Sequence, residues 1–229
     1  MTNSRKLQLP DGLHVAPSIL SADFACLADQ VGVVLDAGAK VIHIDVMDGH
    51  FVPPITVGPL IVEAIADQVH EAGGFVDVHL MIERPERQID YFCAAGADGV
   101  TVHYESTPNV HRALVQIKEA GCSAAVAINP ATPADEVREL GGLIDMVLCM
   151  TVNPGWSGQK FIATSPKKVR RLAEYVGASV SIEVDGGISP ATVPLVKKAG
   201  ARIFVAGSAI FGAADPAAAY REIVAAAAA

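Results

Sequence analysis

The stretch Asp36-Ala-Gly-Ala-Lys40, followed at once by Val41-Ile-His-Ile-Asp-Val46, sets the pattern of the whole chain. A glycine between small residues ends a helical segment, and a short β-branched run follows it. The same arrangement recurs around Gly96, Gly121 and Gly200, and we call these three and Gly38 the marker glycines. Glycine readily adopts the left-handed conformation that ends a helix, and a short apolar run is typical of a strand buried on both faces of a parallel sheet. The pattern therefore predicts repeating β/α units.

Eight such units fit the 229 residues, because the gaps between the marker glycines correspond to one, two or three units of roughly 30 residues. The sequence shows no composition break, which favours a single domain, a closed (β/α)8 barrel over about residues 13–224. A short N-terminal extension precedes it, and we expect the alanine-rich C-terminal tail to be a fraying helix end. A doubly wound open sheet is the structural alternative, but no Gly-x-Gly-x-x-Gly fingerprint follows the first strand. The predicted strands are residues 13–19, 41–47, 75–80, 99–103, 124–128, 146–150, 181–184 and 202–205.

The composition is 51% hydrophobic and 18% charged, which is typical of a chain that buries a large interior. A formal net charge of −8 opposes binding to nucleic acid and to acidic membranes, so a small molecule is the expected partner. No stretch reaches the ~20 apolar residues that cross a bilayer, and no targeting signal is visible. The cysteines have no paired spacing, which predicts small buried hydrophobes in a reducing cytoplasm. They are Cys26, Cys93, Cys122 and Cys149.

Reactive side chains gather where three predicted strands end, the place where β/α barrels carry their active sites. His43 and Asp45 lie on one face of the second strand, His79 lies on the third, and Asp185 ends the seventh. Two histidines and two carboxylates suit a divalent ion such as Zn²⁺, Mn²⁺, Fe²⁺ or Co²⁺. Because charged groups are costly to bury unpaired in Val/Ile-rich strands, four of them together favour function over packing.

Other polar residues nearby have a plainer interpretation. Asp48 and His50 follow the second strand, where a turn or capping role is expected. Asp77 and Glu183 come earlier in their strands and are interpreted as structural. His103 ends the fourth predicted strand, where it can face the cavity, but nothing in the sequence pairs it with the others, so we leave it outside the metal set.

Glycine-rich loops follow the sixth, seventh and eighth predicted strands: Asn153-Pro-Gly155-Trp-Ser-Gly158-Gln159, Asp185-Gly-Gly187-Ile-Ser189 and Ala206-Gly207-Ser208-Ala209. Glycines let backbone N–H groups approach an anion, and the last loops of this fold often bind phosphate. Each loop alone is ordinary turn chemistry. Three in succession predict a phosphate site, which needs no lysine.

These motifs resemble the ribulose-phosphate 3-epimerase family over essentially the whole barrel. The resemblance is carried by Ala16-Pro-Ser-Ile-Leu-Ser-Ala-Asp23, His43-Ile-Asp-Val-Met-Asp-Gly-His-Phe-Val-Pro53, His79-Leu-Met81, Met150-Thr-Val-Asn-Pro-Gly155, Glu183-Val-Asp-Gly-Gly187 and Gly207-Ser-Ala-Ile210. It implies a metal-dependent isomerase that interconverts D-ribulose 5-phosphate and D-xylulose 5-phosphate in the pentose phosphate pathway, and a homo-oligomer. Inverting the carbon beside a ketone means removing its proton, passing through an enediolate and returning a proton to the opposite face. Two bases are therefore needed.

The resemblance also implies roles for individual residues. His43, Asp45, His79 and Asp185 would bind one divalent ion, and Asp45 and Asp185 would be the acid/base pair. The substrate would contact Ser18 and His79, in a cavity lined by Met47, Met81 and Met150. The phosphate would be held by Gly155, Trp156, Ser157, Gly158, Gly186, Gly187, Gly207 and Ser208.

One departure from the family pattern lies in the loop after the sixth strand. The usual Pro-Gly-Phe-Gly-Gly reads Pro154-Gly155-Trp156-Ser157-Gly158, so a serine replaces the middle glycine. If that position needs a positive φ, the serine is strained, whereas its hydroxyl would otherwise add a phosphate contact.

Three rival functions stay open at this point. An epimerase of a six-carbon ketose phosphate such as D-allulose 6-phosphate is the nearest, although such relatives tend to lack the Asp-Gly-Gly and Gly-Ser pair. The lyase branch of phosphate-binding barrels needs Asp-x-Lys-x-x-Asp, and the comparable stretch here reads His43-Ile-Asp45-Val-Met-Asp48, without the lysine. A phosphosugar-binding barrel without turnover would need no metal set.

Overall fold

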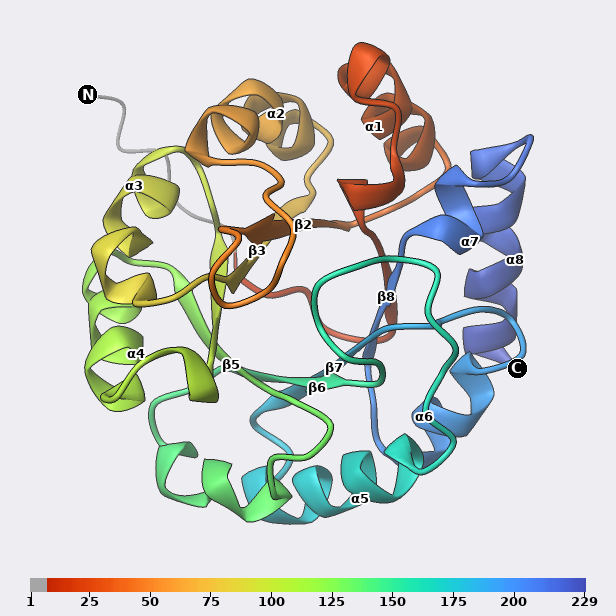
Figure 1. Ribbon diagram of the computed structural model, residues 1–229. Helices are drawn as coiled ribbons and strands as arrows, with labels where there is room; N and C mark the ends of the chain where they lie inside the picture. Colours follow the sequence, from red (N-terminus) through yellow and green to blue (C-terminus); the bar gives the residue numbers. More distant parts are fainter. Residues whose placement is uncertain (1–7) are drawn as a thin grey trace.

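The computed structural model describes residues 8–229, within which eight parallel strands form one sheet. Neighbouring strands pair in the order β1-β8-β7-β6-β5-β4-β3-β2. A further parallel bridge between Ser18 and His43 joins the two ends of this series, so the sheet curls into a barrel (Figure 1). The strands are β1 (His14–Pro17), β2 (Val41–Met47), β3 (Phe75–Met81), β4 (Gly99–His103), β5 (Ser123–Ile128), β6 (Met146–Met150), β7 (Ser181–Asp185) and β8 (Ile203–Ala206).

Helices surround the barrel and cover its outer face (Figure 1). They are α1 (Leu27–Asp36), α2 (Pro59–Glu71), α3 (Ile89–Ala94), α4 (Val110–Glu119), α5 (Ser165–Val176), α6 (Val193–Ala199), α7 (Ser208–Phe211) and α8 (Pro216–Ala228). Between β5 and β6 a 3₁₀ helix, η5 (Ala134–Leu140), takes the place of an α-helix. Shorter 3₁₀ turns are η1 (Ile19–Ser21), η2 (Phe24–Cys26), η3 (Pro85–Arg87) and η4 (Tyr104–Ser106). No helix among residues 8–229 is long and apolar enough to cross a membrane.

The predicted barrel and its eight strands are confirmed, with small differences at the ends. β1 is shorter than predicted because the Ser18 side chain accepts a hydrogen bond from the Leu20 N–H and starts η1. β7 runs one residue further, to Asp185. The marker glycines 38, 96, 121 and 200 have φ values of 108°, 112°, 79° and 118°, the left-handed conformation expected after a helix.

The alanine tail is helical as far as Ala228, and Ala227, 4% exposed, packs in the core. One smaller prediction, the burial of all four cysteines, is wrong. Cys26 is only partly buried, since it lies where η2 meets α1, whereas the other three cysteines are buried as predicted.

The barrel interior is layered along its axis. An apolar layer closes the end at which the strands begin, with Phe75 packed into the space that Gly99 leaves free; a Cβ at Gly99 would lie 2.8 Å from the Phe75 ring. Alternate residues on each strand point inward, and from the middle of the barrel many of these are polar. Fully buried polar groups there are His43, Asp77, His79, Thr101, His103 and Glu183. The polar interior therefore lies towards the carboxyl ends of the strands.

Candidate active site

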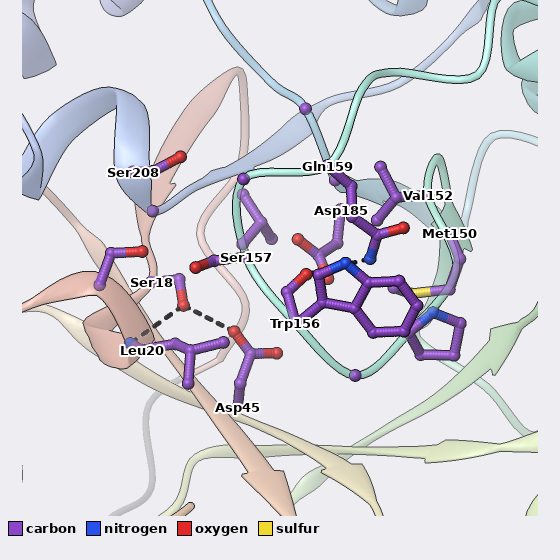
Figure 2. Close-up of a pocket in the computed structure, with 18 of the residues that line it drawn as sticks. Ser18, Leu20, Asp45, Met150, Val152, Trp156, Ser157, Gln159, Asp185 and Ser208 are labelled. Atoms are coloured by element: carbon purple, nitrogen blue, oxygen red, sulfur yellow. Dashed lines mark hydrogen bonds between the residues drawn. The ribbon is translucent and has the colours of Figure 1, made fainter. Parts of the chain in front are cut away.

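A pocket opens at the carboxyl ends of the strands (Figure 2). It brings the two predicted bases together with the three methionines and the glycine-rich loops. Of the predicted site residues, only His43 and His79 do not line it, because both rings lie buried beneath its floor. The predicted residues on its wall are Ser18, Asp45, Met47, Met81, Met150, Gly155, Trp156, Ser157, Gly158, Asp185, Gly186, Gly187, Gly207 and Ser208.

The loop after β6 forms one side of this pocket. Arg84 is the only non-glycine among residues 8–229 with a positive φ, so Ser157 has an ordinary backbone conformation and is not strained. Gln159, which we did not assign to the site, also lines the pocket, and its amide donates to the carbonyl oxygens of Asn153 and Trp156. Its place directly after Gly158 was the available signal. Gln159 therefore braces the loop from within.

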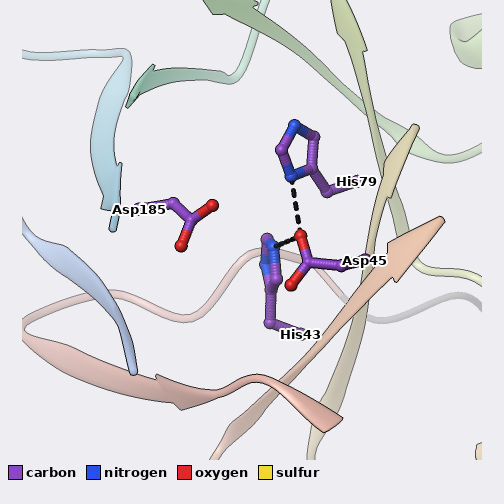
Figure 3. Close-up of side chains that lie close together, drawn as sticks. All are labelled: His43, Asp45, His79 and Asp185. Atoms are coloured by element: carbon purple, nitrogen blue, oxygen red, sulfur yellow. Dashed lines mark hydrogen bonds and ion pairs between the residues drawn. The ribbon is translucent and has the colours of Figure 1, made fainter. Parts of the chain in front are cut away.

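Four side chains meet at the floor of the pocket (Figure 3): His43 and Asp45 from β2, His79 from β3 and Asp185 from β7. One nitrogen or oxygen of each lies within 4.8 Å of those of the others. Oδ1 of Asp45 is the centre, 3.3 Å from Nε2 of His43 and 3.0 Å from Nδ1 of His79. The structure thus brings together the four residues expected to bind a metal.

Each of three residues in this cluster is held by a partner on its far side. Nδ1 of His43 lies 2.6 Å from Oδ2 of Asp77. The Ser18 hydroxyl donates to Oδ2 of Asp45 at 2.6 Å, and Nε2 of His79 lies 2.8 Å from Nε2 of His103. Such outer contacts set ring orientation and tautomer in metal-binding histidines.

The donor set fits a divalent cation. If His43 donates its Nδ1–H to Asp77, its Nε2 lone pair faces Oδ1 of Asp45. His79 presents Nδ1 to the same oxygen. Acceptor atoms that converge in a buried space need a cation or a proton between them, and two imidazoles with two carboxylates are ligands of zinc-like ions.

The cluster has unusual electrostatics. Burial disfavours a charged His43 ring, yet the charges of Asp45 and then Asp77 raise its pKa well above the ordinary value. Burial lowers the pKa of His79 to about 4, which leaves this ring neutral and able to act as a ligand near pH 7.

The pKa values of the two carboxyl groups also shift in opposite directions. Burial opposes ionisation of Asp45, but His43 and His79 hold its pKa below the ordinary value. Burial and then the Asp45 charge raise the pKa of Asp185 to about 7. Two neighbouring carboxyl groups with separated pKa values are a common arrangement in acid/base catalysis, and a divalent cation beside Asp185 would lower its pKa.

The statement that nothing pairs His103 with the cluster is wrong, because its ring contacts that of His79. The inward-facing position at the end of the neighbouring strand was the signal.

Asp77 orients His43, in agreement with a structural role, and Oε1 of the buried Glu183 lies 3.7 Å from Nδ1 of the same ring. The turn role of Asp48 is confirmed: its carboxylate accepts from the backbone N–H groups of His50, Phe51 and Glu83.

Known structures share this fold. A 3-hexulose-6-phosphate synthase superposes with a TM-score of 0.70 at 26% identity, over 94% of this chain and 99% of that one. KGPDC from Streptococcus mutans in complex with D-R5P superposes with a TM-score of 0.75 at 18% identity, over 94% and 97% of the two chains, which shows the fold alone. Both support the β/α barrel.

Similar sequences identify the family. A ribulose-phosphate 3-epimerase of Bacillus subtilis is 51% identical over 215 residues, which cover 92% of this chain and 98% of that protein. A chloroplastic ribulose-5-phosphate-3-epimerase of Arabidopsis thaliana is 48% identical over 91% of this chain and 75% of the relative, and the Escherichia coli enzyme is 42% identical over 92% of each. The model of the "Ribulose-phosphate 3 epimerase family" matches residues 14–211. The chain therefore belongs to the ribulose-phosphate 3-epimerase family.

Proposed function

We propose that this enzyme interconverts D-ribulose 5-phosphate and D-xylulose 5-phosphate by transferring the proton at C3. The observation that carries the proposal is that Asp45 and Asp185 line the same pocket as the glycine loops. They come from β2 and β7, which β1 and β8 separate in the barrel. Two carboxylates placed in this way supply the two bases that inversion requires.

In the proposed reaction, one aspartate takes the C3 proton and the other returns a proton to the opposite face of the enediolate. Ser18 holds Oδ2 of Asp45 with its hydroxyl, which fixes the direction of this base. Met47, Met81 and Met150 fill the cavity with polarizable groups that carry no competing proton.

We assign the cation to His43, Asp45, His79 and Asp185. A bound Zn²⁺, Fe²⁺, Mn²⁺ or Co²⁺ would supply positive charge beside the substrate's carbonyl and hydroxyl oxygens. Beneath it, Asp77 keeps His43 oriented from the other side, and the buried Glu183 lies close to the same ring. His79 would also contact the substrate, as the resemblance implies.

We assign the phosphate to backbone N–H groups of the loops after β6, β7 and β8. Gly186 and Gly187 have φ values of 117° and 65°, which only glycine adopts without strain. The serine hydroxyls of Ser157 and Ser208 lie on the same pocket wall (Figure 2). Binding energy from this end of the substrate would help to position the reacting carbon.

Replacing Gly186 with alanine should raise KM for the phosphosugar at least about tenfold, a loss of about 1.4 kcal/mol in binding. The new Cβ would lie 2.2 Å from a methyl carbon of Val152, and φ is 117°, so the loop must move. The measurement is steady-state kinetics beside a thermal melt, because strain at such a site costs about 1–3 kcal/mol. Gly142→Ala is the control, since its Cβ would enter open space. An unchanged KM in folded Gly186→Ala would remove this loop from the phosphate site.

A coupled assay that compares D-ribulose 5-phosphate with D-allulose 6-phosphate tests the proposed substrate. The five-carbon sugar should have the larger kcat/KM, by about tenfold or more, which is the usual discrimination for one carbon unit in a fitted pocket. A preference for the six-carbon sugar would contradict the proposal. The lyase alternative lacks its lysine, because Asp45 stands at that position.

We also propose a homo-oligomeric, cytoplasmic enzyme of the pentose phosphate pathway. The large apolar side chains Ile55 and Leu60 support an interface between copies, because they are 81% and 78% exposed around the start of α2. Cysteines without paired spacing support a reducing compartment.

A further inference from the structure

A chain of hydrogen-bonding groups leads outward from the cluster, from the buried His79 to the surface. Its Nδ1 faces Asp45, as Figure 3 shows, and its Nε2 lies 2.8 Å from Nε2 of His103. Nδ1 of His103 lies 3.2 Å from Oε2 of Glu105, on the 3₁₀ turn η4. Both rings are fully buried, and Phe51 packs against His103 with ring centroids 4.8 Å apart. Burial therefore keeps water out of the contact between the two rings, whereas Glu105 at the outer end is partly exposed.

The contacts of Glu105, at the outer end of this chain, determine which group donates in its hydrogen bond with His103. Oε1 of Glu105 accepts from the backbone N–H of Asn129 at 2.8 Å and also contacts the Thr132 hydroxyl. Because a backbone N–H only donates, the carboxylate is an acceptor at both ends and takes the Nδ1–H of His103. Hydrogen bonds from His103 and Thr132 outweigh burial and lower the pKa of Glu105 to about 2, so this group is a carboxylate at neutral pH.

The donor and the acceptor in the hydrogen bond between the two rings follow from this assignment. A neutral His103 that donates from Nδ1 has a lone pair on Nε2, and it accepts the Nε2–H of His79. Oδ1 of Asp45, 3.0 Å from Nδ1 of His79, is a second acceptor at the inner end, so this order holds when the proposed cation lies between these two atoms. The one proton of His79 is then placed on Nε2, away from the cluster. Its Nδ1 lone pair points to the position that the proposed function gives to the cation.

We propose that Glu105 and His103 are positioning residues that fix the tautomer of His79, so that Nδ1 is ready to bind the metal. The inference rests on the proposed metal site and extends it to two residues that touch neither substrate nor cation. Glu105 determines which groups donate along the chain, because it accepts from the backbone N–H of Asn129.

Glu105→Gln tests the proposal, because glutamine has nearly the shape of glutamate but reverses the donors and acceptors along the chain. The backbone N–H of Asn129 requires the amide oxygen of the glutamine, so the NH₂ group faces Nδ1 of His103. His103 must then carry its proton on Nε2, where it opposes the Nε2–H of His79. Competition with a chelator of known affinity should show Zn²⁺ binding weakened by about 10–100-fold, the usual effect of losing such a partner. In zinc-loaded protein with ¹⁵N-labelled histidine, the His103 proton should move from Nδ1 to Nε2.

Two further variants separate this role from packing. Glu136→Gln removes the same charge from nearby η5, where the side chain accepts from the Tyr104 hydroxyl, and should bind zinc like the parent. His103→Gln offers an oxygen to His79 and an NH₂ group to Glu105, so it should retain more affinity than Glu105→Gln although its shape changes more. A packing role predicts the opposite ranking.

The outcomes are distinct. If the parent binds zinc and epimerises, and folded Glu105→Gln matches it in affinity and in the His103 spectrum, the tautomer proposal is wrong and the proposed function stands. If the parent epimerises but binds no divalent metal, the proposed metal site is wrong and the tautomer proposal fails with it.

Discussion

Removing divalent metal from the purified enzyme with a chelator is expected to abolish epimerisation. Without a cation, the negative charge that forms on the substrate oxygens is left beside Asp45 and Asp185. Lewis-acid stabilisation of such charge is worth several kcal/mol, so the rate should fall by about a thousandfold or more. Metal analysis and the coupled assay on the same sample are the measurements. Adding Zn²⁺, Mn²⁺, Fe²⁺ or Co²⁺ should restore turnover.

The fold should survive this treatment, which makes the result interpretable. The His43 pKa is raised by Asp45 and Asp77 against the effect of burial, so a proton on this ring can replace part of the lost positive charge. Circular dichroism should therefore stay unchanged. His79→Ala should lose the metal, whereas His50→Ala, an exposed histidine on the neighbouring loop, should keep it. Full activity in protein shown to be free of metal would exclude the proposed cation.

The inward-facing set on one strand is predictable from the sequence, because side chains alternate with a period of two. His43, Asp45 and Met47 had to share a face once residues 41–47 were recognised as a strand. The fold also fixed where they gather, since the carboxyl ends of all the strands meet at one end of a barrel. The four-residue cluster follows from these two rules without any knowledge of contacts.

Contacts between strands are not predictable in this way, because the sequence does not give the register. In the register between β3 and β4, His79 pairs with Thr101. His103 lies two residues further along β4 on the same face, and its ring contacts that of His79. Glu105 acquires its role from Asn129 and Thr132, which follow β5 and are distant in sequence. Similarly, the hydroxyl of Ser18 reaches Asp45 because an isolated bridge joins β1 to β2.

Replacing Asp185 with asparagine should lower the epimerisation rate by at least the roughly 10²–10⁴ typical of a general acid or base. The variant lacks one proton carrier but keeps Asp45, which the Ser18 hydroxyl still holds. Half of the chemistry should therefore survive. In deuterated water the variant should exchange the C3 proton of one epimer, the one whose C3–H faces Asp45, and exchange the other barely at all. Nuclear magnetic resonance of each sugar phosphate gives both rates.

Asp45→Asn should show the mirror preference, and the pair of variants assigns one epimer to each aspartate. Both residues are also proposed ligands, so metal content must match that of the parent before the rates are compared. Asp135→Asn, the same change at an exposed position on η5, is the control for the substitution itself. Loss of metal alone would slow exchange of both epimers together, whereas loss of one base removes one and spares the other. If metal-loaded variants exchange both epimers equally, or epimerise near the parent rate, the two aspartates are not separate bases on opposite faces.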